Sequence, residues 1–336
     1  MQILFTHSYF LALDPKQKKA GNAYPPLGTL YAAALMRSRG YTVSLFDSML
    51  AKSPLEVEAA LDQQAPGYFV IYDDGFNYLT KMCLTNMRAA AFEMTKLAKQ
   101  RGAKVIVCSS DSTDHYAAYL DAGADYVVFG EGEMTLAELV DTIEAGKDVE
   151  EIPGIAFKLN GSAKQTGRRN VIRDLDTLPL PAWDLVNIAA YKQLWIRKHG
   201  YFSLNIVGSR GCTFKCNWCA KPLFGNRYHA RSVSSVIAEL KMLVSAFGAD
   251  HIWFCDDIFG LKPGWLKEFA EAVQKEKLEF SFKIQSRADL LLEKDTARYL
   301  SLAGCDEVWM GAESGSQKIL DAMDKGTTVE QIYMSR

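Results

Sequence analysis

Three cysteines in one short segment are the residues of this chain best suited to chemistry. Cys212, Cys216 and Cys219 follow an apolar segment over 203–208 and are spaced C-x-x-x-C-x-x-C. A loop that coils once can direct three thiolates at one 4Fe–4S cluster and leave one iron without a protein ligand, open to a small molecule. Structural zinc usually takes four ligands in C-x-x-C pairs. No matching pair or histidine partner stands nearby in the sequence, so the cluster is favoured over zinc.

The other four cysteines, Cys83, Cys108, Cys255 and Cys305, stand singly. The total of seven is odd, which does not suit a framework of paired disulfides. Cys255 and Cys305 fall in a strand-like segment and at a helix end, and we expect both to belong to the core. The cysteines therefore indicate a metal site in a reducing compartment.

The elements around the cysteine motif form a repeated strand–helix pattern. Strands are expected over 203–208, 251–255, 280–285 and 307–310, with helical segments between them. Parallel strands joined in this way have their carboxyl ends at one edge of the sheet, beside the cysteines. The polar residues at those ends are Asp256, Asp257, Arg287, Glu313 and Ser314. Taken alone, each carboxylate among them could be an ordinary cap or turn residue, but its place behind the cysteine motif favours a ligand-binding role for Glu313.

The first half of the chain also alternates strands with helices. Strands are expected over 3–6, 43–46, 68–72, 104–109 and 125–129, and helices are expected to begin near residues 27, 54, 79, 114 and 134. This order predicts a doubly wound parallel α/β sheet, whose ligands bind outside the carboxyl ends of the strands. Small polar residues at those ends suit hydrogen bonds to a phosphate-bearing tail, although such residues are also common in any loop. No G-x-G-x-x-G follows the first strand, so a dinucleotide is not favoured.

The pattern changes between the two halves. The segment 151–173 predicts a hairpin with its turn near Asn160-Gly161, and 173–185 contains two prolines, which suit a linker. We therefore expect a first domain over 1–148, a hairpin and proline-containing linker over 149–200, and a second domain over 201–336. The boundary is expected near Pro181.

At the cysteine motif the sequence resembles the radical S-adenosylmethionine (SAM) superfamily, in its methylthiotransferase-like class B type. The segments DDIF at 256–259 and GAESGS at 311–316 resemble family segments that follow the motif in the same order. The resemblance implies a partial TIM-like (β/α) barrel, a 4Fe–4S cluster on the three cysteines, and reductive cleavage of SAM to a 5′-deoxyadenosyl radical. The SAM contacts that it implies are Trp218 at the adenine, Asp256 and Asp257 near the methionyl amino group, Arg287 at the carboxylate, and Glu313 and Ser314 at the ribose and methionine.

The first half resembles the Rossmann-like, cobalamin-binding domain that precedes many radical SAM domains. The resemblance is carried by PPLG at 25–28, by the strand order, and by VVFGEGE at 127–133. The cobalamin contacts that it implies are Ser109, Ser110, Gly130, Glu131 and Gly132.

The chain departs from that pattern at two places. The Asp-x-His-x-x-Gly signature is missing around His7, and the fourth strand ends in CSSDSTDH where relatives have a Gly-Gly-His-Pro-like turn. We therefore expect His7 to be a loop histidine with local hydrogen bonds, not a cobalt ligand. Asp73 and Asp74 are expected to be turn residues, since Asp-Asp-Gly is ordinary turn chemistry.

The two resemblances together imply methylation of an unactivated carbon, with cobalamin carrying the methyl group. A radical rearrangement, cyclisation or oxidation without methyl transfer stays open. A methylthiotransferase acting on transfer RNA would need a second cysteine triad in the first domain, where only Cys83 and Cys108 occur. The family barrel has six strand–helix units and only four fit before residue 336. A truncated chain that binds metal without turnover is therefore the non-enzymatic alternative.

Composition limits the partners. The net charge is −2 from 38 basic and 40 acidic side chains, without a lysine or arginine run, so no nucleic acid is expected. The N-terminus reads MQILFTHSYF, which predicts a first strand and not a signal peptide, and no apolar run suits a membrane span. We expect a cytoplasmic protein with a small-molecule or lipid substrate and a reducing partner such as flavodoxin or ferredoxin.

Overall fold

The computed structural model describes residues 1–77, 84–219 and 224–336. The chain forms two compact units. The first unit comprises Met1–Ile172 and Leu178–Leu194, and the second comprises Arg173–Thr177 and Trp195–Arg336. No helix in the described part of the chain is both long enough and apolar enough to cross a membrane.

The first unit is built on a seven-stranded sheet in the order β2-β1-β3-β4-β5-β6-β7. The strands are β1 (Gln2–Thr6), β2 (Thr42–Phe46), β3 (Tyr68–Tyr72), β4 (Lys104–Cys108), β5 (Tyr126–Val128), β6 (Ile155–Leu159) and β7 (Ser162–Gln165). The first five are parallel, whereas β6 pairs antiparallel with β5, and β7 pairs antiparallel with β6. β2 pairs with one edge of β1, and the chain then crosses over to add β3 at the other edge. The strand order therefore reverses here, and the carboxyl ends of β1 and β3 form a topological switch point.

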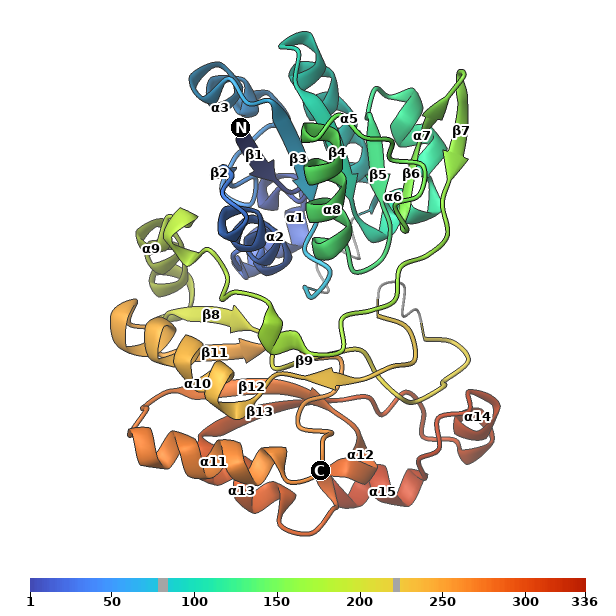
Figure 1. Ribbon diagram of the computed structural model, residues 1–336. Coiled ribbons are helices and arrows are strands. Elements are labelled where there is room, and N and C mark those ends of the chain that lie inside the picture. Colours follow the sequence, from blue (N-terminus) through green and yellow to red (C-terminus); the bar gives the residue numbers. More distant parts are fainter. Residues whose placement is uncertain (78–83, 220–223) are drawn as a thin grey trace. The chain divides into compact units, whose positions relative to one another are not determined.

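Helices cover both faces of this sheet (Figure 1). One face is covered by α2 (Leu27–Ser38) and α8 (Glu133–Glu144), and the other by α3 (Val57–Gln64), α5 (Leu84–Gln100) and α7 (Tyr116–Asp121). Alternate strand residues such as Leu4, Phe69 and Val105 pack in one cluster with α3 and α5, because successive side chains of a strand point to opposite faces. The described part of this unit also contains α1 (Pro15–Ala20) and α6 (Ser110–Asp114).

The predicted doubly wound α/β class is confirmed, with differences in detail. The helix expected from residue 79 begins at Leu84 among the described residues, and 79–83, including Cys83, lie outside them. The helix expected over 114–122 is replaced by the two short helices α6 and α7. The hairpin forms as predicted, but its first strand pairs with β5 and so extends the first sheet, where the sequence suggested a segment of the linker.

The second unit contains a four-stranded parallel sheet in the order β13-β12-β11-β8. Its strands are β8 (Ser203–Ile206), β11 (His251–Phe254), β12 (Ser281–Ser286) and β13 (Cys305–Met310). A short antiparallel ribbon, β9 (Ser209–Arg210) with β10 (His229–Ala230), follows β8. The helices are α9 (Ile188–His199), which contains the boundary between the units, α10 (Val233–Leu240, continued by a π-helix over Lys241–Ala246), α11 (Trp265–Glu276), α12 (Ala288–Leu291), α13 (Thr296–Ala303), α14 (Gln317–Ala322) and α15 (Val329–Met334).

The two faces of the second sheet differ in chemistry. On the face toward α11, aromatic rings interlock, with Phe254 5.6 Å from Phe269 and 5.3 Å from Phe282 between ring centroids. The alternate residues of β12 point to the opposite face, where the Lys283 ammonium lies 5.2 Å from the centroid of Trp253. The apolar face therefore forms the core against α11, whereas the opposite face carries the Lys283 ammonium beside Trp253.

Candidate active site

The cysteine loop lies between β9 and β10, beyond the carboxyl end of β8 (Figure 1). Gly211, directly before the first cysteine, has a φ of +82°, and a Cβ there would lie 2.0 Å from the carbonyl oxygen of Arg227. Only glycine fits this close approach. Cys212 is buried, Cys216 is half-buried and Cys219 is exposed, and all three are thiols outside any disulfide.

The three thiols share one loop, as predicted from their spacing. In residues 1–77, 84–219 and 224–336, no three cysteine, histidine or acidic side chains lie close enough together to hold a metal ion. Three cysteine thiols beyond a strand end nevertheless fit a 4Fe–4S cluster by their donor chemistry, because thiolates are its ordinary ligands. Ligation by these residues stays a prediction.

Asp256 anchors the turn that leads into the cysteine loop. Its carboxylate accepts a hydrogen bond of 3.0 Å from the Gly208 backbone N–H and another from the Ser209 hydroxyl. Burial raises the pKa of Asp256 to about 7, although these hydrogen bonds act in the opposite direction. Asp256 therefore holds β8 and the loop in place, whereas the neighbouring Asp257 is exposed.

Arg287, at the carboxyl end of β12, lies against the cysteine loop. Its guanidinium carbon is 3.6 Å from the ring centroid of Phe214, and its Nη1 is 4.0 Å from the sulfur of Cys216. Nε and Nη2 donate to the two carboxylate oxygens of Asp289 at 2.9 and 3.0 Å, and Nη2 also donates to the Lys325 carbonyl at 2.8 Å. These contacts fix the planar guanidinium in one orientation over an aromatic face.

Glu313, beyond the carboxyl end of β13, is held in an uncommon backbone conformation. Its φ is +62°, in the left-handed region that a glutamate rarely adopts. The Lys325 ammonium donates to its carboxylate at 3.0 Å, and a Cβ on Gly311 would come within 2.9 Å of both partners. The hydroxyl of Ser314 accepts a hydrogen bond from the Ser316 N–H at 3.0 Å. Backbone strain of this kind is often found at ligand-binding sites.

The second half of the cysteine loop is hydrogen-bonded to the C-terminal end of α14. The Asn217 backbone N–H donates to the Met323 carbonyl at 3.0 Å, and its side-chain amide donates to the Ala322 carbonyl at 2.7 Å. Trp218, the next residue, is 50% exposed. Sequence reasoning did not assign Phe214 and Asn217. Their contacts are made with residues far away along the chain, and only the position of Phe214 between two cysteines could have drawn attention to it.

In the first unit, several residues predicted to contact cobalamin have structural partners. The Ser109 side chain caps α6, with a hydrogen bond of 2.8 Å from the Ser112 N–H. The carboxylate of Glu131 accepts from the Ile172 N–H. The Gly132 backbone N–H donates to the Tyr72 hydroxyl at 3.2 Å, and a side chain has no room there because a Cβ would lie 2.5 Å from the Cys108 sulfur. Ser110 is half-buried in the first turn of α6, and Gly130 has a φ of +68°.

The polar residues at the switch point also bind one another. The backbone N–H and hydroxyl of Ser8 donate to the Asp73 carboxylate at 2.7 and 2.8 Å. His7 Nε2 lies 3.1 Å from a carboxylate oxygen of Asp47, whose other oxygen accepts from the Tyr191 hydroxyl at 2.7 Å. His7 thus makes the local hydrogen bonds that were expected of it.

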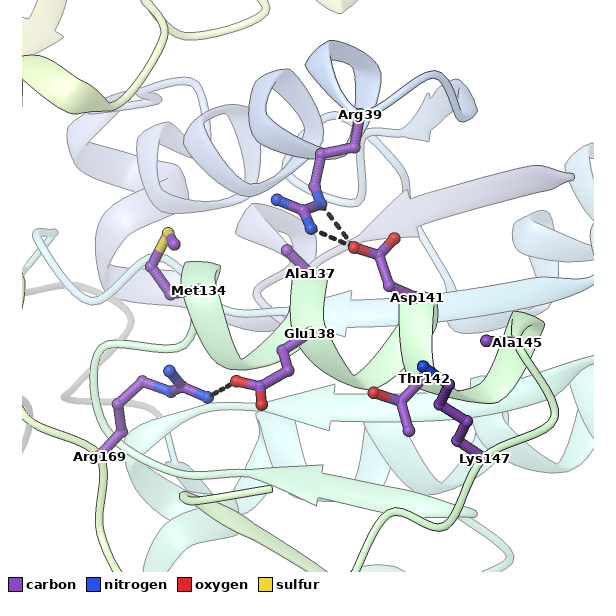
Figure 2. Close-up of a pocket in the computed structure, with 9 residues that line it drawn as sticks. All are labelled: Arg39, Met134, Ala137, Glu138, Asp141, Thr142, Ala145, Lys147 and Arg169. Atoms are coloured by element: carbon purple, nitrogen blue, oxygen red, sulfur yellow. Dashed lines mark hydrogen bonds and ion pairs between the residues drawn. The ribbon is translucent and has the colours of Figure 1, made fainter. Parts of the chain in front are cut away.

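A surface pocket of about 380 Å³ lies over α8 in the first unit (Figure 2). Its charged side chains pair across the helix surface, Arg39 with Asp141 and Arg169 with Glu138. None of the predicted cofactor residues lines this pocket.

Comparison with known proteins places this geometry in a family. Residues 206–334, which include the cysteine loop and the ends of β11, β12 and β13, match the model of the radical SAM superfamily. An uncharacterized methyltransferase of Pyrococcus horikoshii is 30% identical over 330 residues, which cover 96% of this chain and 68% of the relative. The chain belongs to the radical SAM superfamily. An anaerobic magnesium-protoporphyrin IX monomethyl ester cyclase of Synechocystis sp. is 24% identical over 94% of this chain and 63% of the relative.

Solved structures of radical SAM enzymes share the fold of the whole chain. The cobalamin-dependent enzyme OxsB, with aqua-cobalamin and SAM bound, matches 99% of this chain and 47% of its own with a TM-score of 0.79 at 19% identity. The methyltransferase TsrM of Kitasatospora setae, with cobalamin and a 4Fe–4S cluster bound, matches 98% of this chain and 65% of its own with a TM-score of 0.77 at 17% identity. The predicted pairing of a doubly wound domain with a partial radical SAM barrel is confirmed. The chain spans less than two thirds of both structures.

Proposed function

We propose that this chain binds a 4Fe–4S cluster through Cys212, Cys216 and Cys219 and cleaves SAM reductively. The observation that carries the proposal is the cysteine loop beyond β8, with Arg287 from the end of β12 lying against it. When bound, the cluster would supply the electron that breaks a carbon–sulfur bond of SAM and gives a 5′-deoxyadenosyl radical. Three thiolates suit this chemistry because they leave one iron open to SAM.

The residues around the loop have separate roles in the proposal. Arg287 binds the SAM carboxylate through Nη1, which lies 4.0 Å from the Cys216 sulfur, while Asp289 and the Lys325 carbonyl hold the rest of the guanidinium. Glu313, positioned by Lys325, accepts hydrogen bonds from the ribose. Ser314 and Asp257 contact the methionyl part, and Trp218 contacts the adenine.

Asp256 is proposed as a positioning residue. Its carboxylate oxygens are both engaged by the turn before the cysteine loop, so it acts on SAM through that loop.

We propose that the full reaction is cobalamin-dependent methylation of an unactivated carbon. Several relatives are named as methyltransferases or methylases, among them a hopanoid C-3 methylase of Methylococcus capsulatus, 24% identical over 93% of this chain and 58% of the relative. Ser110 and the backbone of Gly130 are the groups we assign to the cobalamin tail, since Ser109, Glu131 and Gly132 have structural partners. The substrate would be a small molecule or a lipid, and the electron would come from a reducing partner.

A radical reaction without methyl transfer is the second candidate. It is favoured by two relatives that are not named as methyltransferases. One is the magnesium-protoporphyrin ester cyclase of Synechocystis sp. described above. The other is a 4′-phospho-dehydrooxetanocin synthase of Priestia megaterium, 24% identical over 60% of this chain and 29% of the relative. Both candidates share the cleavage of SAM and differ in whether S-adenosylhomocysteine is also formed.

The experiment is an anaerobic assay of the chain reconstituted with iron, sulfide and hydroxocobalamin, with SAM as substrate and dithionite as reductant. We expect 5′-deoxyadenosine in the wild type and none with Cys216→Ala. Cys305→Ala is the matched control, because Cys305 lies at the opposite end of β13 from the loop. Formation of S-adenosylhomocysteine as well would favour methylation over the second candidate. Absence of 5′-deoxyadenosine from the wild type would contradict the proposal.

A further inference from the structure

A second pocket, of about 450 Å³, opens in the second unit beside the cysteine loop. Thr213, which directly follows Cys212, lines it together with Tyr228 and Pro263. The other side chains that define its chemistry are Arg173, His229 and Lys262. The pocket therefore combines basic side chains with a position next to the proposed cluster ligands.

The charge of this pocket is one-sided. Its described lining residues include no carboxylate. Burial lowers the pKa of His229, and the charges of Arg173 and Arg227 lower it further, which indicates that both guanidinium groups lie near the imidazole. Arg173, Arg227 and Lys262 are exposed. We call the three charged residues, Arg173, Arg227 and Lys262, the basic rim; His229, with its lowered pKa, adds no positive charge at neutral pH.

The acidic residues nearest in sequence do not cancel this charge within the pocket. Asp176 accepts hydrogen bonds from the Ser232 N–H at 3.1 Å, outside the lining residues, and Asp256 is buried beneath the loop. Asp174 is exposed but follows Arg173 outside the lining. In a chain whose net charge is −2, the basic rim stands out as a local positive surface.

We propose that the basic rim docks an acidic one-electron donor of the flavodoxin class beside the cysteine loop. The inference rests on the proposed function, which requires an electron from outside the chain. Complementary charge steers and orients a transient partner without needing a large interface. A flavodoxin hydroquinone gives up one electron per encounter and becomes a semiquinone, and a cluster held by the cysteine loop would accept that electron, so the electrons balance without a further reactant.

The test is the binding of a purified acidic bacterial flavodoxin to the reconstituted chain, measured by isothermal titration calorimetry at low and at high ionic strength. We expect Arg173→Glu combined with Lys262→Glu to raise the Kd at least about tenfold at low salt and to flatten its salt dependence. Arg298→Glu is the matched control: Arg298 is an exposed arginine of α13 in the same unit, and its reversal is expected to leave the Kd within about twofold of the wild type. Arg173→Gln with Lys262→Gln should give an intermediate Kd.

A second readout separates this inference from the proposed function. Dithionite is small and needs no docking surface, so the double reversal should form 5′-deoxyadenosine normally with dithionite and slowly with reduced flavodoxin. Failure of the wild type with dithionite would overturn the proposed function, while the calorimetric result would still test the docking surface. A wild type that does not bind flavodoxin, an unchanged Kd in the double reversal, or an equal loss with Arg298→Glu would overturn the docking inference.

Discussion

The carboxyl edges of the two parallel sheets differ in what their polar residues contact. At the edge of the first sheet, polar side chains bind neighbouring strand ends, as Ser8 binds Asp73 and Tyr191 binds Asp47. At the edge of the second sheet, Arg287 and Asp256 contact one segment, the cysteine loop and the turn before it. Arg287 stacks on Phe214 within the cysteine segment, and Asp256 anchors the turn before it.

This difference shows how one architecture can serve two purposes. Polar groups that satisfy one another stabilise the edge of a sheet, whereas groups gathered around a loop preorganise a site for a ligand. Glu313, beyond the carboxyl end of β13, supports this interpretation. It is a non-glycine residue in the strained left-handed backbone conformation that is often found at ligand-binding sites. We therefore expect substitutions at the first edge to affect folding, and substitutions at the second edge to affect cofactor binding as well.

The largest effect is expected from Gly211→Ala. The added Cβ would meet the Arg227 carbonyl at 2.0 Å in a backbone with φ of +82°, so we expect a loss of about 3 kcal/mol in the free energy of unfolding, together with loss of cluster absorbance. Urea unfolding and the iron content after reconstitution measure the two effects.

Gly225→Ala is the control for this substitution. Gly225 lies in the same segment with φ of +64° but has nothing within 4 Å of an added Cβ, so it should cost about 1 kcal/mol from backbone strain alone. Equal losses in the two variants would contradict a close approach at Gly211.

The next effect is expected on SAM affinity, from Arg287→Ala. The substitution removes the Nη1 donor that we assign to the SAM carboxylate, and charged hydrogen bonds contribute about 1.5–3 kcal/mol. We expect the Kd for SAM to rise about tenfold to a hundredfold, and Arg287→Lys to recover only part of this because lysine lacks the planar fork. Equilibrium dialysis with SAM measures it. Unchanged affinity, or an equal loss with Arg298→Ala on α13, would contradict a specific role.

A smaller effect concerns the pH dependence of stability through Asp256. Its pKa is raised from 3.8 to about 7 in the folded chain, so the folded state holds the proton more tightly than the unfolded state. The resulting stabilisation is complete below about pH 4 and is lost as the pH rises through about 7. Asp256→Asn should remove this slope.

The comparison must be made between wild type and variant at each pH. Burial lowers the pKa of His251 from 6.5 to about 4, which gives an opposite slope, since that contribution is lost as the pH falls through about 4. Urea unfolding at several pH values between 4 and 8 gives the difference. A difference between Asp256→Asn and wild type that does not vary with pH would contradict the raised pKa.

The smallest effect on cofactor binding is expected from His7→Gln, at the carboxyl edge of the first sheet. The imidazole is buried and lies against Asp47, so its loss should cost about 1 kcal/mol of stability and leave the absorption bands of retained cobalamin in place. A shift of those bands, or loss of cobalamin that the wild type retains, would contradict a purely structural role for His7.

Much of the architecture could be predicted from periodicity. The alternation of apolar strands with helices placed the parallel strands of both units, and the cysteine spacing placed the loop beyond β8. The hairpin was also visible, because a Gly-containing turn separates its two strands. Its partner was not, since pairing of β6 with β5 depends on contacts across the chain.

The details of the site could be predicted less well. The spacing of cysteines says nothing of the carbonyl that Gly211 approaches or of the ring that Arg287 covers. Asp256 was assigned from its place at a strand end, which could not reveal that its carboxylate is occupied by the Gly208 and Ser209 donors on a neighbouring segment. Such contacts join residues tens of positions apart, and they depend on how the strands align.

Whether the cysteine loop holds an iron–sulfur cluster is measured most directly by an ultraviolet–visible spectrum after anaerobic reconstitution with iron, sulfide and hydroxocobalamin and subsequent desalting. We expect a broad iron–sulfur shoulder that is lost with Cys216→Ala and kept with Cys305→Ala, with corrinoid bands in all three proteins. A wild type without the shoulder, or a Cys216→Ala variant that retains it, would show that these cysteines do not hold the cluster.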